Sequence, residues 1–376
     1  MKIVFLQNKG KSYGGIWQVN KLVGEALIRD GYEVSVISIR ENHNEYEPKY
    51  DNRMHVETLN PHDEWETYNY SEVLNDLKKF HIKSAFKKLK HRLHNNKTMK
   101  EDAKKLKICL EKEKPDYIVN SHYQVLDMIP KEYLKITYHE HHTDFNDALK
   151  KDNWKTLVRY NNKVKFIWLC KGTMDKAIEH GLNNNHYIYN AVRFENYEKN
   201  NVVEHKKLVT VARICAQKRI DKMVNICNEL FSNPKYSDWK LEIYGDGPLF
   251  DDVKKLIRSS QIKMMGRINN VKDAFMSSSI NLITSDYEGF CLTIVEGYEC
   301  FLPVVSLDFK EPTKEVIEDN VSGFIAKDEN DFLIKLKSLM DNPKLLEKMS
   351  NNAKKYNEKF HIDKIVKEWE KLFKEN

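Results

Sequence analysis

Residues 2–39 read KIVFLQNKGKSYGGIWQVNKLVGEALIRDGYEVSVISI, and this stretch decides the fold class. It begins with an apolar run typical of a buried strand, passes through a glycine-bearing loop, and ends in a second apolar run, EVSVISI. Between the two runs a helix is predicted to end at Gly31, and its apolar face consists of Ile16, Val19, Leu22, Val23, Ala26 and Leu27. A strand, a helix and a second strand in this order predict a parallel sheet covered by helices.

The same alternation continues through the first half of the chain. Strands are predicted at 55–59, 116–121, 135–140, 165–170 and 186–190, and a long helical stretch at 71–114. Residues 196–206 show little periodicity and are interpreted as a connection between domains.

After this connection the alternation starts again. Strands are predicted at 208–213, 240–247, 262–267, 280–285, 303–307 and 323–326, and helices at 221–231, 249–260, 271–278, 292–301 and 331–342. A chain of 376 residues is too long to fold around a single hydrophobic core. We therefore predict two doubly wound, Rossmann-like α/β domains, 1–195 and 196–355, that face an interdomain cleft, and a terminal amphipathic helix within 356–376.

Composition narrows the class of protein. Hydrophobic residues make up 41% and charged residues 31%, which is typical of a folded globular chain. None of the six cysteines forms a CxxC pair, so we expect reduced thiols and a cytoplasmic location. The N-terminus reads as a strand rather than a signal peptide, and no apolar run approaches 18 residues, so we expect neither export by this route nor a membrane span.

The charge is concentrated in one segment. Residues 78–107 hold twelve Lys or Arg against Glu101 and Asp102, a balance of +10 within a total of +6, so the rest sums to −4. A basic amphipathic helix over 73–107 suits peripheral contact with an anionic membrane, such as the inner face of the cell membrane, or with an anionic polymer. The alternative is a helix packed on the sheet with a solvated lysine face. No recognised motif accompanies the charge, so nucleic acid is not an expected partner.

The apolar segment TSDYEGFCLTIVEGYECFLPVVSLD, residues 284–308, holds three glutamates, and two of them, Glu288 and Glu296, stand eight positions apart. Glu288 is predicted in a loop after a buried strand, and Glu296 in the second turn of the following helix. The start of that helix offers unpaired N–H groups to an anion, and Gly289 allows close approach of a ligand. The alternative is a pair of surface glutamates.

Two cations follow the first strand of the second domain. Arg213 ends that strand and Lys218 lies in the next loop, so both are expected at the carboxyl edge of the sheet near Glu288. Together they could neutralise a diphosphate, although a solvated basic loop is the plainer interpretation.

Two further patterns lie in the first domain. Gly14 and Gly15 precede the first helix, but they do not form GxGxxG and no acid supports a dinucleotide site, so a turn that admits a phosphate or sugar is the interpretation. The run HEHH holds His139, His141 and His142 after a predicted strand. Alternation of strand-end residues disfavours a metal site, and one histidine hydrogen-bonding in the cleft is preferred.

Taken together, these motifs resemble the retaining glycosyltransferases of GT-B architecture, and within them glycosyltransferase family 4, over essentially the whole chain. The resemblance rests on Gly14-Gly15, His139, the segment YNAVRF around Asn190, Arg213 and Lys218, YGDGP at 244–248, MGRI at 265–268, and EGFCLTIVE at 288–296, which matches the family's E-x7-E motif. The last helix of that family also packs back on the first domain.

The resemblance implies a role for each matched residue. Arg213 and Lys218 would bind the donor diphosphate, Glu296 the ribose, and Glu288 the donor sugar ring. His139 would hydrogen-bond the sugar, and Gly14 and Gly15 would let their loop close on the diphosphate. Backbone groups would come from Ile268 for the base and from Gly289, Phe290, Cys291 and Leu292 for sugar and phosphate.

The resemblance also implies the reaction. A hexosyl or N-acetylhexosaminyl unit would pass from a nucleotide sugar, with UDP favoured, to a cell-surface glycan, glycolipid or glycoprotein, with front-face attack and retention. No cofactor is expected, and no essential metal, since no DxD follows a strand. Two departures stand out: SLDFKEPTKEVI replaces a glycine-rich segment, and Cys170 stands where serine is common. The alternatives are a non-catalytic GT-B subunit that binds glycan or stabilises a partner enzyme, or an epimerase or phosphorylase of the same architecture.

Overall fold

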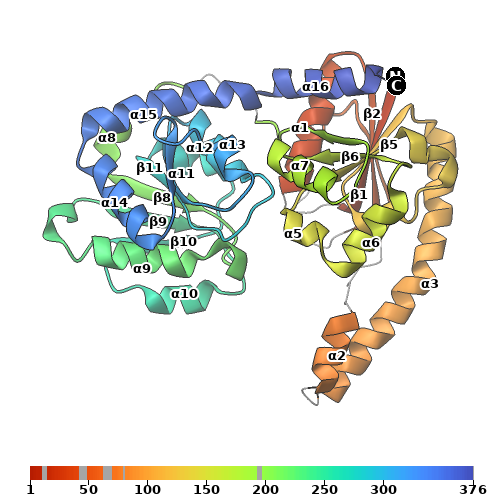
Figure 1. Ribbon diagram of the computed structural model, residues 1–376, viewed down its shortest axis with the longest axis horizontal. Helices are drawn as coiled ribbons and strands as arrows, with labels where there is room; N and C mark the ends of the chain where they lie inside the picture. Colours follow the sequence, from red (N-terminus) through yellow and green to blue (C-terminus); the bar gives the residue numbers. More distant parts are fainter. Residues whose placement is uncertain (11–14, 42–48, 62–69, 79–80, 193–196, 376) are drawn as a thin grey trace.

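The computed structural model describes residues 1–10, 15–41, 49–61, 70–78, 81–192 and 197–375. Within them the strands form two parallel sheets, one of seven strands in the order β3-β2-β1-β4-β5-β6-β7 and one of six in the order β10-β9-β8-β11-β12-β13 (Figure 1). In both sheets the chain starts near the middle and winds outward in two directions, as the alternating pattern predicts. Each strand predicted above is present, with its ends shifted by at most three residues.

The first sheet is covered by helices on both faces. Its strands are β1 (Lys2–Gly10), β2 (Glu33–Glu41), β3 (His55–Asn60), β4 (Tyr117–Asn120), β5 (Thr137–His141), β6 (Lys165–Trp168) and β7 (Asn185–Tyr187). Ile3 and Phe5 pack in a cluster with α1 (Gly15–Arg29), whereas Val4 and Leu6 pack in another with α3 (Ile82–Glu113). Short helices follow at α4 (Tyr123–Leu126), α5 (Phe145–Ala148), α6 (Lys151–Tyr160) and α7 (Lys171–Glu179).

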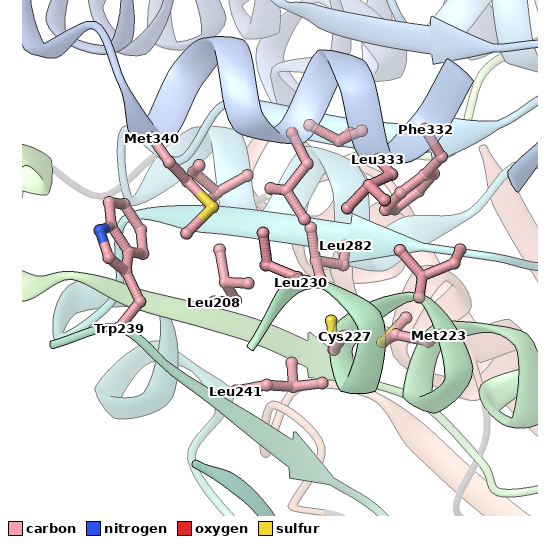
Figure 2. Close-up of a cluster of buried hydrophobic side chains, with 14 of the residues drawn as sticks. Leu208, Met223, Cys227, Leu230, Trp239, Leu241, Leu282, Phe332, Leu333 and Met340 are labelled. Atoms are coloured by element: carbon pink, nitrogen blue, oxygen red, sulfur yellow. The ribbon is translucent and has the colours of Figure 1, made fainter. Parts of the chain in front are cut away.

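The second sheet has the same plan. Its strands are β8 (Lys207–Val211), β9 (Lys240–Tyr244), β10 (Ile262–Gly266), β11 (Ile280–Ile283), β12 (Val304–Leu307) and β13 (Gly323–Ala326). Its helices include α9 (Ile220–Leu230), α10 (Phe250–Leu256), α11 (Val271–Met276), α12 (Leu292–Glu299), α13 (Thr313–Val316) and α14 (Glu329–Met340). Figure 2 shows Leu208, Leu241 and Leu282 of three strands in one cluster with side chains of α9 and α14.

Among the described residues, seven α-helices were not predicted, namely α4, α5, α6, α7, α8, α13 and α15. The short helix α8 (Val202–His205) lies in the segment interpreted as a connection, and α15 (Pro343–Tyr356) follows α14. Asn342 caps α15 by accepting a hydrogen bond from the backbone N–H of Leu345, and Pro343 occupies its first turn. These local signals were present in the sequence.

The chain passes between the domains at two adjacent places. The backbone N–H of Val192 donates to the carbonyl of Phe360 (2.9 Å), and that of Ile362 donates to the carbonyl of Val192 (3.1 Å). From there α16 (Ile362–Lys374) runs back along the first domain and packs on α1 (Figure 1). Trp369 and Phe373 are buried in the cluster that holds Ile3 and Phe5. The last helix thus completes the core of the first domain.

The long helical stretch is two helices rather than one. A short helix, α2 (Tyr70–Lys78), precedes α3, and the two pack together. The later half of α3 lies on the sheet, with Leu106 and Leu110 in the core and Asp102 2.7 Å from the buried Arg40. The earlier half projects from the domain together with α2 (Figure 1).

The six cysteines are free thiols. Within the described part of the chain, none of the helices combines the length and the apolar character that crossing a bilayer requires.

Candidate active site

The loops that follow the strands of the two sheets meet between the domains. A Cβ atom on Gly289, in the loop after β11, would lie 2.2 Å from the carbonyl oxygen of His142, which follows β5. A Cβ atom on Gly15, at the start of α1, would lie 3.0 Å from a methyl group of Leu292, the first residue of α12. The carboxyl edges of the two sheets therefore face each other here, where open parallel sheets bind ligands.

A buried ion pair lies at this edge. The Lys218 ammonium is 2.5 Å from Oε1 of Glu288, whose side chain is almost wholly buried. Burial alone would lower the pKa of Lys218, but the neighbouring Glu288 carboxylate outweighs it, and the pKa of Lys218 is raised. Lys218 is therefore held in its charged form beside the Glu288 carboxylate.

The loop that carries Lys218 is fixed to the loop that carries Glu288. The hydroxyl of Thr284 donates to the carbonyls of Lys218 and Arg219 (3.1 and 2.9 Å), and the backbone N–H of Asp286 donates to the carbonyl of Gln217 (2.9 Å). The cation and the carboxylate are thus positioned by backbone contacts as well as by each other.

Arg213 lies earlier in the same loop, two residues after β8 ends. Its side chain is exposed, and among the described residues no carboxylate forms an ion pair with it. Arg213 and Lys218 therefore bring two positive charges to the carboxyl end of β8, as predicted from the sequence.

The start of α12 has an unusual backbone. Cys291 precedes the helix with φ at 73°, a left-handed conformation that a side chain disfavours. Burial, with the nearby Glu288 carboxylate, raises the pKa of the Cys291 thiol to about 12, so it stays protonated. Phe290 is 2% exposed and packs against Tyr189 and Phe360, which anchors the loop beside the crossing between the domains.

Glu296 lines a cleft of about 400 Å³ between α1 and α12. Burial raises the pKa of this carboxyl to about 7. The cleft has aromatic, cationic and acidic side chains on its walls, among them Trp17, Lys21, Tyr197, Lys272, Leu292 and Glu299. Such a mixed lining suits a polar ligand with an apolar ring.

Two other predicted residues sit at its margins. Ile268 follows β10 and packs against the cluster that contains Phe275, which itself lines the cleft. Gly15 begins α1, whereas Gly14 lies outside the described residues.

The structure corrects the placement of His139. This residue lies inside β5 rather than after it, is 1% exposed, and has its ring 5.0 Å from that of Tyr123 and 6.3 Å from that of Phe166. Burial lowers its pKa to about 3, so the imidazole is neutral. His139 is therefore buried in this structure, and its described contacts, with Asn120, Tyr123 and Phe166, lie within the first domain.

His142, just after β5, meets the second domain through its backbone. Its backbone meets Gly289, and its Nε2 lies 2.8 Å from a carboxylate oxygen of Glu140, also buried at the end of β5. Side chains alternate between the two faces of a sheet, so residues 139 and 142 point to opposite faces where the backbone is extended. If the end of β5 had been known, this alternation could have distinguished the two histidines. Among the described residues, no group of three or more His, Cys, Asp or Glu side chains is arranged to hold a metal ion.

Gln217 was also missed from the sequence. Its side-chain amide donates to the carbonyl of Tyr287 (2.8 Å) and, over a longer 3.5 Å, to Oε2 of Glu288. Lys218 and Gln217 thus contact different oxygens of the Glu288 carboxylate.

Comparison with known proteins places the site in context. Residues 192–356, which carry Lys218, Glu288 and Glu296, match the family model described as Glycosyl transferases group 1. An uncharacterized glycosyltransferase of Haemophilus influenzae is 30% identical over 173 residues, which cover 44% of this chain and 48% of that protein. The poly(ribitol-phosphate) α-N-acetylglucosaminyltransferase of Staphylococcus aureus is 26% identical over 244 residues, which cover 62% and 49%. The chain spans about half the length of these relatives.

Solved structures match over the whole chain. Staphylococcus aureus TarM, in a complex with fondaparinux, α-GlcNAc-glycerol and UDP, superposes with a TM-score of 0.78 at 16% identity and 99% coverage of both chains. Anabaena HepE, in a complex with UDP and glucose, gives 0.71 at 15% identity and 100% coverage of both chains. At these identities the likeness shows the fold, and the fold is the GT-B architecture of two Rossmann-like domains.

Proposed function

We propose that this chain is a retaining glycosyltransferase of the family 4 type that transfers a hexosyl or N-acetylhexosaminyl unit from a UDP-sugar. The observation that carries the proposal is the Lys218–Glu288 ion pair at the carboxyl edge of the second sheet, beside exposed Arg213 and opposite the loops of the first domain. A nucleotide sugar presents a diphosphate joined to a polyol. Two cations and a carboxylate at one sheet edge match both parts.

The cations act on the leaving group. As the bond between the anomeric carbon and the phosphate oxygen breaks, negative charge grows on the diphosphate. Arg213 and Lys218 stabilise that charge in a partly desolvated site, where preorganised charges are most effective. In this proposal they supply the positive charge that a metal ion supplies elsewhere, so chelation of metal ions should leave the transfer rate unchanged.

The carboxylates hold the donor. Glu288, paired with Lys218, accepts hydrogen bonds from sugar hydroxyls and faces the positive charge that develops at the anomeric carbon. Glu296 of the E-x7-E motif accepts from the ribose hydroxyls in the cleft beside Trp17 and Lys272. The acceptor oxygen attacks the anomeric carbon on the face from which the diphosphate leaves, and its proton passes to the departing phosphate oxygen, so configuration is retained.

The acceptor is proposed as a cell-surface glycan, glycolipid or glycoprotein. Support comes from the relatives, since one is named for transfer to poly(ribitol-phosphate) and another, from Bacillus subtilis, for transfer of glucose to poly(glycerol-phosphate). A cytoplasmic enzyme at the inner face of the membrane would meet such acceptors during their synthesis.

A panel of nucleotide sugars, read by nucleotide release and thermal shift, tests the proposal. We expect release from one UDP-sugar, and loss of about 100-fold or more in rate for Lys218→Met and Glu288→Gln. Lys255→Met, which changes an exposed lysine of α10, is the matched control and should behave as wild type.

The outcomes separate the competing functions. Tight UDP binding without turnover on any donor, unaffected by Glu288→Gln, would identify a non-catalytic subunit. Release of a free epimerised sugar without an acceptor would identify an epimerase, and a requirement for inorganic phosphate a phosphorylase.

A further inference from the structure

A helical arm extends from the first domain, and the proposed transfer reaction does not use it. We define the arm as residues 70–78 and 81–90, that is, α2 and the beginning of α3. Figure 1 shows it reaching away from the sheets and from the second domain. A helix rises about 1.5 Å per residue, so α3, with its 32 residues, is about 48 Å long and carries the arm well clear of the core.

The arm is held together by its own contacts. Val73 of α2 and Ala85 of α3 are the described side chains buried within it, 5% and 2% exposed. Asp76 accepts from the ammonium of Lys88 (2.8 Å) and from the hydroxyl of Ser84 (2.6 Å), which ties α2 to α3. The arm therefore presents a defined surface.

Apolar side chains on this surface face water. Leu74, Leu77, Ile82 and Phe86 are 47%, 45%, 55% and 67% exposed. Ile82 and Phe86 stand four residues apart and therefore share one face of α3, and Leu74 and Leu77 stand three apart on α2. Single exposed apolar residues are ordinary, but four within one projecting hairpin indicate a contact surface.

Lysines border the apolar residues. Lys83, Lys87 and Lys90 follow one stripe of α3 beside Ile82 and Phe86, and all three are exposed, as is Lys78 at the end of α2. Over residues 70–90 the sequence has six lysines against Glu72 and Asp76. Of these two acids, Asp76 is already paired with Lys88.

We propose that the arm docks on an anionic lipid bilayer, with its apolar side chains in the interface and its lysines at the headgroups. Charge complementarity selects an anionic partner. The exposed apolar side chains then favour a bilayer over a soluble polyanion, because only the bilayer offers an apolar medium to receive Phe86 and Ile82. The later half of α3, anchored by Leu106 and the Asp102–Arg40 pair, connects the docked arm rigidly to the first domain.

Co-sedimentation of the full chain with lipid vesicles tests the proposal. With phosphatidylglycerol in phosphatidylcholine vesicles, we expect binding about tenfold or more above that to phosphatidylcholine alone, decreasing with salt. The double variant Lys83→Glu, Lys87→Glu should lose that difference. The double variant Ile82→Ser, Phe86→Ser should reduce vesicle binding several-fold.

Matched controls come from the other half of α3. Lys100→Glu with Lys104→Glu repeats the charge change with the same spacing, and Ile108→Ser removes an apolar side chain that is 66% exposed. These controls should bind like wild type, and UDP binding by each variant reports that the domains are folded.

Two results would overturn the proposal. One is equal binding to neutral and anionic vesicles, or binding to neither. The other is a pair of observations: the Ile82→Ser, Phe86→Ser variant binds vesicles as well as wild type, and soluble polyphosphate competes with the vesicles for the arm. Together they would show that the arm binds a soluble polyanion.

Discussion

Glu296 is the carboxyl group whose titration the site changes most clearly. Its pKa rises from 4.5 to about 7 because the side chain is desolvated in the cleft. The native state therefore keeps a proton that the unfolded chain has lost between about pH 4.5 and pH 7. Its contribution to stability is complete below this window and lost above it.

Replacement by glutamine removes this titration. For Glu296→Gln we expect the free energy of unfolding to rise relative to wild type by about 1–3 kcal/mol on going from pH 4 to pH 8. Urea unfolding at several pH values measures it. Parallel stability curves for the two proteins would show that Glu296 is solvated in the free protein.

Gly289 lies against the first domain with no room for a side chain. A methyl group there would lie 2.2 Å from the backbone oxygen of His142, so Gly289→Ala must separate the two loops. We expect kcat/KM for the sugar donor to fall by about tenfold to 100-fold, because the groups around the donor are displaced.

The control for this change is a glycine without such a neighbour. Gly181 has a left-handed φ of 87°, but a methyl group added there would meet nothing within 4 Å, so Gly181→Ala should lower stability by about 1 kcal/mol and leave kcat/KM unchanged. Equal loss of activity in the two variants would argue against displacement at the site.

The residues that could be predicted from sequence are those with local signals. Arg213, Lys218, Glu288 and Glu296 follow strand ends or helix starts, and strand ends were predicted within three residues. His139 was expected to reach the cleft, but it lies inside β5 and its side chain is buried in the first domain, where strand alternation places it. No local sequence pattern indicated Gln217, because its contacts are with the loop after β11, which is distant from it in the sequence.

The start of α7 is closed by a side chain from the other domain. Glu315 of α13 accepts from the backbone N–H groups of Lys171 (2.9 Å) and Gly172 (2.7 Å), and from the hydroxyl of Tyr189 (2.8 Å). Within the first domain, the thiol of Cys170 accepts from the N–H of Thr173 (3.4 Å). A carboxylate at a helix start is favourable, and this one also joins the two domains.

Removal of this carboxylate should loosen the contact. For Glu315→Ala we expect a loss of about 1–3 kcal/mol in the free energy of unfolding, since two backbone donors and a hydroxyl lose their acceptor. Faster hydrogen exchange at residues 171–173 should accompany it.

Asp175→Ala is the comparison, because its ion pair with Lys171 is exposed and should contribute less than about 0.5 kcal/mol. If the two substitutions changed the free energy of unfolding by similar amounts, Glu315 would not join the two domains.

Elements were predicted well where amphipathic periodicity was strong, as in α1, α9 and α16. The break between α2 and α3 was not, because apolar residues recur at helical spacing on both sides of it. The direction in which the arm leaves the domain depends on the Arg40–Asp102 pair and on packing against β2, which periodicity does not report.

In the whole molecule, α16 belongs to one domain by sequence and to the other by packing. Trp369 is 2% exposed, with its ring 6.2 Å from that of Tyr138 of β5 and 5.6 Å from that of Phe373. We expect Trp369→Ala to cost about 3–5 kcal/mol, and to do so in the first domain. Lys371→Ala, at an exposed position of the same helix, should change stability by less than about 0.5 kcal/mol.

Hydrogen exchange resolved by segment locates the effect. Increased exchange in β1, β4 and β5, with β8 to β13 unchanged, is the expected pattern. An effect confined to the second sheet would mean that α16 does not support the first domain.

The return of α16 also has a consequence for biosynthesis. A ribosome makes residues 1–190 first, but the apolar face of this half stays uncovered until residues 362–373 emerge, after the entire second domain has been made. During that interval Ile3, Phe5 and Tyr138 have no α16 to cover them, so the nascent first domain is a natural client for chaperones. The first domain can therefore complete its core only after the second domain has been made, although its own strands are synthesised earlier.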